Sequence, residues 1–149
     1  MRHTTTWILV ATSSYAEVFE RLGDKLRLIE KRDHPEGRKK VHELITDKPG
    51  RTFAIASTER HSLGEENEQV KRHYRNMFIH DLLRFCLTAK NGGSFDTLNI
   101  IAPPDFLGEL RKVFHKEAPL HAAIDQEIAK DLPAYLSLQA KVDMILGLI

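Results

Sequence analysis

The chain has 149 residues, of which 42% are hydrophobic and 29% charged, and its formal net charge is +1. This length suits one domain with a core of its own, and the near-neutral total excludes a global electrostatic attraction to nucleic acid or to a membrane. One cysteine excludes an internal disulfide framework, and no apolar run approaches the ~20 residues that span a bilayer, so we expect a single cytoplasmic domain over residues 1–149.

The N-terminal part of the chain has the pattern of three strands joined by short turns. Thr5–Thr12 is a nearly continuous apolar run, as expected for a central strand covered on both faces. Tyr15–Arg21 and Lys25–Lys31 follow, and the tight-turn signal Gly23-Asp24 separates them. These segments predict an antiparallel meander.

A long segment without a sustained period follows the meander. Residues 38–44 suit one or two helical turns, and residues 46–64 predict a long loop. Long ordered loops in compact domains are uncommon and are more often functional than short ones. We therefore expect this loop to be the contact element of the protein. Its candidate binding residues are Asp47, Pro49, Gly50, Arg51, Arg60 and His61.

Glu65–Lys90 has the strongest helical pattern in the sequence. Lys71, Arg72 and Arg75 lie mainly off its apolar stripe, so with the loop they predict one local positive surface. The three are candidate ligand-binding residues, although charged helix faces are usually only solvated. Asn91-Gly92-Gly93 predicts a helix stop with a left-handed glycine. The apolar stripe consists of Val70, Tyr74, Met77, Phe78, Leu82, Phe85 and Cys86.

Strands and helices alternate in the remaining chain. Thr97–Ala102 predicts a second buried strand, and a helix over Asp105–His115 follows Pro103-Pro104. Leu120–Ile128 predicts a helical turn that passes into a third buried strand near Ala123–Ile128.

The C-terminal helix, residues 137–149, carries more apolar side chains than one core needs. The surplus predicts either deep packing or a protein partner, and we expect a homodimer through this helix. The surplus side chains are Met144, Leu146, Leu148 and Ile149.

This order of elements predicts an α/β fold: a mixed sheet of about five strands, first an antiparallel meander and then parallel strands, covered by helices. The ribonuclease-H-like arrangement has this order. A metal nuclease of that fold needs several carboxylates in the sheet centre, but Thr5–Thr12 has none and Asn99 stands in the second buried strand. The histidines show no zinc-site spacing. We therefore predict no metal and no cofactor.

The loop residues have several interpretations, which the sequence leaves open. Arg60 and His61 suit recognition of phosphate or of a base, and His61 suits a general base in a hydrolase. Alternatively, Asp47, Arg51 and Arg60 hold the loop in place by charge-assisted hydrogen bonds. Cys86 lies on the apolar stripe, which predicts a buried, inert thiol.

Five segments in order, WILVAT, DKPGRTF, RH, APPDFLGELRK and KDLP, resemble the bacterial host attachment protein family. That family reads along the lines of WVLVAD, SDRPGRSF, RH, APPRFLGELR and KDLT. The match covers nearly the whole chain, and it departs at Thr12, where the family often has Asp, and at Pro133, where it often has Thr. The family name implies a role in attachment to host cells. We see no export signal or anchor, which favours an indirect role.

The family is similar in turn to the middle domain of class-one release factors of archaea and eukaryotes and of the Pelota ribosome-rescue protein. Their long loop reaches the peptidyl-transferase centre and, in release factors, carries Gly-Gly-Gln. Asp47–His61 lacks this motif, and Gly92-Gly93 precedes Ser94, so peptidyl-tRNA release is disfavoured. The resemblance implies association with the ribosome or with structured RNA. We expect no membrane partner and no recognition of a DNA sequence. The alternative is a non-catalytic interaction domain indirectly required for attachment.

Overall fold

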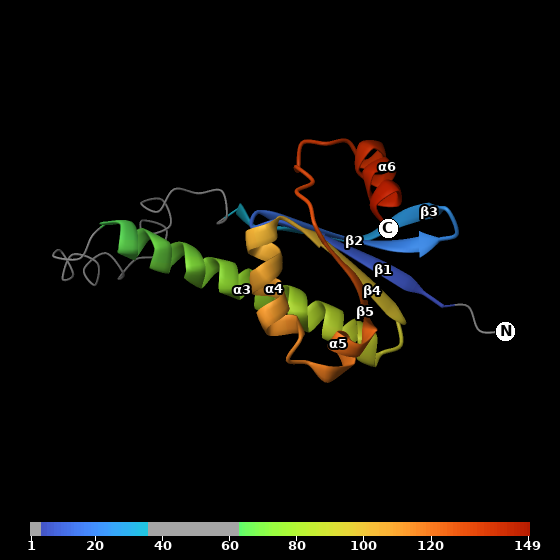
Figure 1. Cartoon of the computed structure of the whole chain (residues 1–149), viewed down its shortest axis with the longest axis horizontal. Helices are drawn as coiled ribbons and strands as arrows, with labels where there is room; N and C mark the ends of the chain where they lie inside the picture. The colour runs from blue at the N-terminus through green and yellow to red at the C-terminus, as the bar shows by residue number, and fades with distance from the viewer. Residues whose placement is uncertain (1–3, 36–62) are drawn as a thin grey trace.

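A mixed β-sheet with helices on both faces forms the centre of the molecule (Figure 1). The computed structural model describes residues 4–35 and 63–149. Within these residues, helices α3, α4 and α5 cover one face of the sheet, and α6, the last helix, covers the other. The described part of the chain is therefore a three-layer α/β structure.

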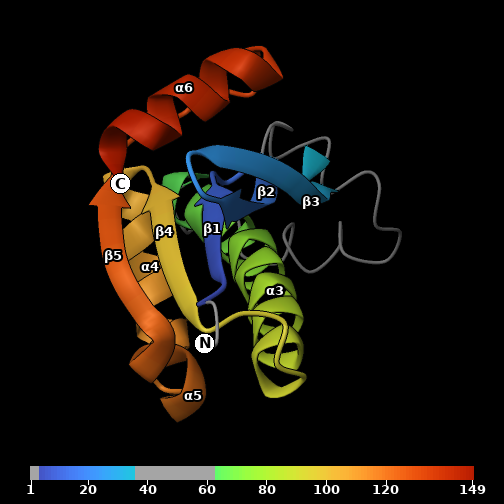
Figure 2. The same ribbon diagram turned by 90° about the vertical axis from the view of Figure 1, so that its right-hand side faces the viewer.

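The sheet has five strands in the order β3-β2-β1-β4-β5 (Figure 2). The central strand β1 (Thr6–Ala11) pairs antiparallel with β2 (Tyr15–Leu22) and parallel with β4 (Thr97–Ala102). The edges are β3 (Lys25–Asp33), antiparallel to β2, and β5 (Ile124–Ala129), parallel to β4. The predicted fold class is confirmed, because a meander precedes the parallel strands and the first strand is central.

The two apolar runs of the sequence are the two innermost strands of the parallel part. β1 and β4 are almost entirely buried, since helices cover both of their faces. We predicted a third buried strand near Ala123–Ile128. The strand is present, but the prediction that it is buried was wrong. The strand β5 forms there, but it lies at the sheet edge, and Asp125 is exposed while Ile128 is half-buried.

Helix α3 (Leu63–Asn91) packs its C-terminal half on the sheet, while its first half extends past the sheet (Figure 1). Leu63 and Gly64, which we expected in the loop 46–64, are its first residues; the rest of that loop, and the turns predicted at 38–44, lie outside the described residues. Met77 was wrongly placed on the apolar stripe. It is exposed, and Ile79, on the opposite edge of the stripe, is buried instead.

Helix α3 ends at the predicted glycine stop. Gly93 has φ +78°, a left-handed conformation that glycine adopts without strain. The Ser94 N–H donates to the Ala89 carbonyl at 2.9 Å, and the Gly93 N–H donates to the Lys90 carbonyl at 3.1 Å. These two bonds form a Schellman motif and satisfy carbonyls at the helix end.

Helices α4 (Pro104–Phe114) and α5 (Ala118–Ala123) complete the first face of the sheet. Pro104 occupies the first turn of α4, where a proline loses no helical hydrogen bond. The helix buries four side chains against α3 and the sheet: Phe106, Leu107, Leu110 and Phe114.

Helix α6 (Leu138–Leu148) covers the second face of the sheet, and the Ser137 hydroxyl caps it by accepting from the Ala140 N–H at 3.1 Å. Much of its apolar surplus packs against this face: Met144, Leu148 and Ile149 lie against the core cluster that contains Ile145. This sheet face therefore accounts for much of the surplus.

A buried ion pair also joins α6 to the sheet. The Lys141 ammonium donates to a Glu17 carboxylate oxygen at 2.5 Å, and both side chains are buried. The same ammonium lies 4.8 Å from the centroid of the Tyr15 ring. The sequence pattern gave no sign of this pair, because Glu17 stands in β2 opposite an element more than a hundred residues away.

Candidate functional site

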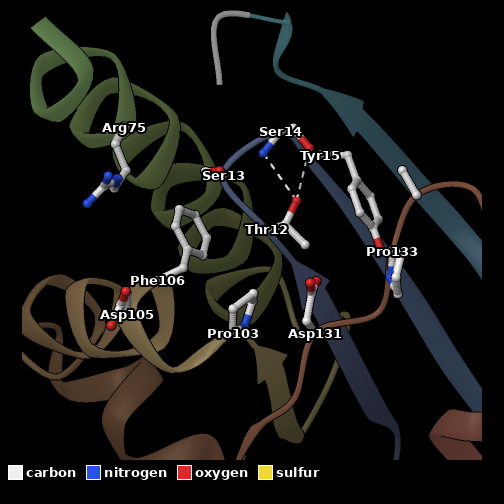
Figure 3. A pocket seen from close by; sticks show the side chains of 11 residues that line it. Thr12, Ser13, Ser14, Tyr15, Arg75, Pro103, Asp105, Phe106, Asp131 and Pro133 are labelled. Atoms are coloured by element: carbon white, nitrogen blue, oxygen red, sulfur yellow. Dashed lines mark hydrogen bonds between the residues drawn. The ribbon is translucent and has the colours of Figure 1, made fainter. Parts of the chain in front are cut away.

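A cleft opens at the carboxyl ends of β1 and β4. The chain leaves β1 toward β2 and leaves β4 toward α4, so the two connections diverge from neighbouring parallel strands. Crevices of this kind are common ligand sites in open α/β sheets. The cavity has a volume of about 410 Å³ (Figure 3). It is lined by Thr12, Ser13, Ser14, Tyr15, Arg75, Pro103, Asp105, Phe106, Asp131, Pro133 and Ala134.

The turn between β1 and β2 places hydroxyl groups at the cleft. Thr12 Oγ1 accepts a hydrogen bond from the Ser14 N–H at 3.1 Å and lies 3.2 Å from Ser14 Oγ. The Thr12 N–H donates to the Tyr15 carbonyl at 2.8 Å and closes the turn. Asp131 points toward this turn from the segment after β5 (Figure 3).

Tyr15 forms a fixed wall of the cleft. Its ring is buried, and its hydroxyl donates to the Leu132 carbonyl. Burial raises the pKa of Tyr15 above its usual range, and the charges of Glu17 and Asp131 raise it further. The phenol therefore stays neutral near physiological pH and holds the Leu132 segment instead of exchanging protons.

Charge is divided between the cleft and the helix beside it. Asp105 and Asp131 are exposed at the cleft, whereas the Arg75 guanidinium is half-buried and donates to Glu109 at 3.1 Å. One turn earlier on α3, Lys71 and Arg72 are exposed, and neither forms an ion pair within the described residues. The cleft itself therefore suits hydrogen-bond donors, and the adjoining turn of α3 suits anions.

Comparison with protein families gave one match. A family model described as "Protein required for attachment to host cells" matches residues 7–136. The chain belongs to this family. Comparison with curated proteins gave no match.

Two solved structures are similar to nearly the whole of this host-attachment-family chain. An archaeal translation termination factor matches with a TM-score of 0.49 and 10% sequence identity, over 97% of this chain and 39% of its own. A structure described as an archaeal protein matches with a TM-score of 0.44 and 14% identity, over 95% of this chain and 33% of its own. The chain thus spans well under half the length of either protein.

The family match covers every residue that lines the cleft but not α6. The cleft lining extends from Thr12 to Ala134, inside the matched residues 7–136, whereas α6 begins at Leu138. The cleft is therefore part of the region that defines the family, and α6 lies outside it.

The structure places three of the nine residues predicted to bind a ligand. Lys71 and Arg72 are exposed on α3, and Arg75 reaches the cleft, where Glu109 neutralises it. The other six candidates lie outside the described residues: Asp47, Pro49, Gly50, Arg51, Arg60 and His61.

The chain leaves the described N-terminal part at the rim of the cleft. The His34 N–H donates to the Ser14 carbonyl at 2.8 Å, and His34 Nδ1 lies 2.6 Å from the Ser13 carbonyl oxygen. The His34 ring stacks on Phe78 of α3 with centroids 4.4 Å apart. His34 therefore holds the end of the described N-terminal part beside this turn.

The cleft was not predicted from the sequence, because its polar residues come from separate parts of the chain. The available signal was that hydroxyl residues follow the first apolar strand at Ser13-Ser14 and that Asp105 and Asp131 follow the later strands. Asn99, which we noted where a nuclease needs an acid, is buried, and its side-chain oxygen accepts from the Gln126 N–H at 3.1 Å. It joins β4 to β5.

Three other features were considered within the described residues: a metal site, a membrane-spanning helix and a reactive cysteine. Residues 4–35 and 63–149 contain no group of three or more His, Cys, Asp or Glu side chains that could hold a metal ion. No helix in this part of the chain is long and apolar enough to cross a membrane. Cys86 is fully buried, and burial raises the pKa of its thiol to about 12, as expected for an inert group.

Proposed function

We propose that this member of the host-attachment family associates in the cytoplasm with the ribosome or with structured RNA, without catalysing peptide release. The observation that carries the proposal is the exposed pair Lys71 and Arg72 on the part of α3 that extends past the sheet (Figure 1). The resemblance to release-factor middle domains supports it. The lack of Gly-Gly-Gln in Asp47–His61 supports binding without release.

The charge distribution suits a contact with few phosphates. With a net charge of +1, the protein lacks the general positive field of a non-specific nucleic-acid binder. Lys71 and Arg72, together with Arg51 and Arg60 of the predicted loop, would form up to four phosphate contacts. Each contact releases counterions, so we expect log K to fall with log salt concentration with a slope of about −3.

A salt-dependent titration tests the role of α3. Ribosomes and a labelled RNA hairpin are titrated with the protein between about 50 and about 200 mM KCl. Lys71→Ala/Arg72→Ala should weaken binding and flatten the salt slope by about one unit per lost contact. The matched control, Lys112→Ala/Lys116→Ala, removes two exposed charges from α4 and its C-terminal flank and should bind as the wild type does. Equal weakening in both variants would remove the support for a specific surface.

A second titration separates the two interpretations of the loop. If Arg51, Arg60 and His61 contact RNA, their replacement by alanine should weaken binding and leave the melting temperature within a degree or two. If these side chains instead hold the loop on the protein, the same variant should melt several degrees earlier. Unchanged binding with unchanged melting would contradict both interpretations.

A protein contact is the second candidate function, and one observation favours it. Tyr135 and Leu138, in and just after the connection to α6, are 85% and 50% exposed. Much of the remaining apolar surplus of α6 packs on the protein's own sheet. A homodimer through the C-terminal helix would therefore form around Tyr135 and Leu138.

A further inference from the structure

Tyr15 of β2 contacts three separate parts of the molecule. Its side chain lines the cleft, and its hydroxyl donates to the carbonyl of Leu132 in the connection between β5 and α6. The Lys141 ammonium of α6 lies 4.8 Å from the centroid of its ring. Figure 3 shows this ring beside Pro133 of the same connection. One buried side chain therefore joins the cleft, the connection and the last helix.

The connection, residues 130–137, forms one wall of the cleft. Asp131 and Pro133 line the cavity on either side of Leu132. The Leu132 side chain is fully buried in the core under α6, where Ile145 of that helix is also buried. A movement of this wall away from the cleft would therefore take Leu132 away from the Tyr15 hydroxyl and out of the core that α6 covers.

Helix α6 is held on the sheet by contacts that allow it to leave as a unit. The buried pair of Glu17 and Lys141 adds little net resistance, because both charges regain their hydration when the helix leaves. The apolar contacts of α6 belong to the smaller of the two cores. The Ser137 hydroxyl caps α6 from within the connection, so this bond is kept when both move together. Units with less buried apolar contact open at a lower free energy than the main core.

We propose that residues 130–137 and α6 form one strap that opens and closes as a unit, and that Tyr15 couples it to the cleft. In the closed form, the Tyr15 hydroxyl holds Leu132 and completes the cleft wall. In the open form, the cleft loses this wall. By linkage, a ligand that contacts the closed wall stabilises the docking of α6, and a partner that draws α6 away weakens that ligand. The strap does not depend on the RNA contact proposed for Lys71 and Arg72.

Thiol labelling tests whether the strap opens without the rest of the protein. Leu132→Cys places a small apolar thiol at the buried position of the strap, whereas the native Cys86 is buried in the main core. Iodoacetamide labelling of the two sites is followed by peptide mass spectrometry and corrected for their rates in the unfolded chain. We expect the introduced thiol to react at least about tenfold faster than Cys86, because only the strap must open. Equal corrected rates would mean that both thiols are exposed by global unfolding, and this would overturn the proposal.

Hydrogen exchange followed by NMR tests whether α6 opens together with the connection. Tyr15→Phe keeps the ring beside Lys141 but removes the hydrogen bond to Leu132. If opening of α6 also breaks that bond, the amides of α6 should exchange about tenfold faster in this variant. The matched control, Tyr135→Phe, removes the hydroxyl of a tyrosine of the same connection that is 85% exposed, and it should leave the rates unchanged. Unchanged exchange of α6 in Tyr15→Phe would show that the helix leaves the sheet without the connection, and it would overturn the coupling.

Discussion

The buried ion pair between Glu17 and Lys141 joins two charges on the sheet face that α6 covers. Their side chains are 3% and 7% exposed, so both groups have lost most of their hydration. Attraction between buried charges seldom exceeds this desolvation cost by much. The pair is therefore better explained as fixing where α6 lies on the sheet, because any shift of the helix would leave two buried charges unpaired.

Replacing one partner of this ion pair should lower the free energy of unfolding far more than replacing both. We expect Lys141→Met to destabilise the protein by about 3 kcal/mol, because Glu17 would stay buried and unpaired. The double variant Glu17→Leu/Lys141→Met should recover most of that loss. Urea unfolding at neutral pH measures both, with Lys112→Met on exposed α4 surface as the control. A single variant as stable as the control would contradict this role.

Glu127 lies between two basic side chains, Arg111 and His115. Its oxygens accept from Arg111 Nε and lie 2.7 Å from His115 Nε2, and the His115 ring stacks on His121 with centroids 4.5 Å apart. Burial alone would raise the pKa of Glu127, but the hydrogen bonds from Arg111 and His115 outweigh it and lower the pKa below the ordinary 4.5.

This lowered pKa predicts a specific loss of stability in acid. The folded protein holds Glu127 ionised at pH values where the unfolded chain binds a proton, so the contribution is complete above about pH 5 and is lost as the pH falls through the folded-state pKa. Glu127→Gln should therefore lose less stability than wild type on acidification below about pH 5. Urea midpoints across this range measure the difference, and parallel curves would contradict it.

At the scale of elements, the sequence predicted what local patterns determine. Apolar runs identified β1 and β4 because both of their faces are covered, and Gly93 marked the end of α3 because only a left-handed residue closes that motif. The pairing of the strands, and which side chains the helices and strands bury, were harder to predict from the sequence. Local sequence does not reveal that β5 lies at an edge or that Met77 faces outward.

The sequence predicted the candidate binding residues that lie together on one helix, but not the cleft, which several elements form. The cations of α3 follow from its helical period, whereas the cleft needs the ends of β1 and β4 and the segment after β5 to meet. That meeting depends on strand order, which no short pattern encodes. The six loop candidates of residues 47–61 lie outside the described residues, and their role stays a prediction.

Replacing the glycine that follows α3 and replacing the glycine inside α4 should change stability in opposite directions. Gly93→Ala should destabilise by about 1 kcal/mol, because a side chain is strained at φ +78° even though open space surrounds the position. Gly108→Ala should instead be neutral or stabilise by up to about 1 kcal/mol, since it lies within α4 and its Cβ would meet no atom. Thermal unfolding of both variants measures the difference, and a Gly93→Ala variant that melts no earlier than wild type would contradict the role of Gly93.

On the scale of the whole molecule, the two sheet faces are covered unequally. The first face carries α3, α4 and α5 over a large continuous core, whereas α6 alone packs on the smaller core of the second face. In the connection before α6, Leu132 is buried in this smaller core, whereas the side chains that follow it are more exposed. Tyr135 and Leu138 are exposed there, and the proposed dimer would bury them.

This geometry predicts a dimer that depends on two side chains. Light scattering should show the mass of a dimer at high micromolar concentration, and Tyr135→Ser/Leu138→Gln should shift it to the monomer without changing the melting temperature of the monomer. Met77→Gln, which removes an exposed apolar side chain from α3, should leave the dimer intact. Stable dimers bury about 800 Å² per partner, more than two side chains provide, so neighbouring residues of α6 must join the contact. A wild-type chain that stays monomeric at high micromolar concentration would show that the exposed pair forms no such contact.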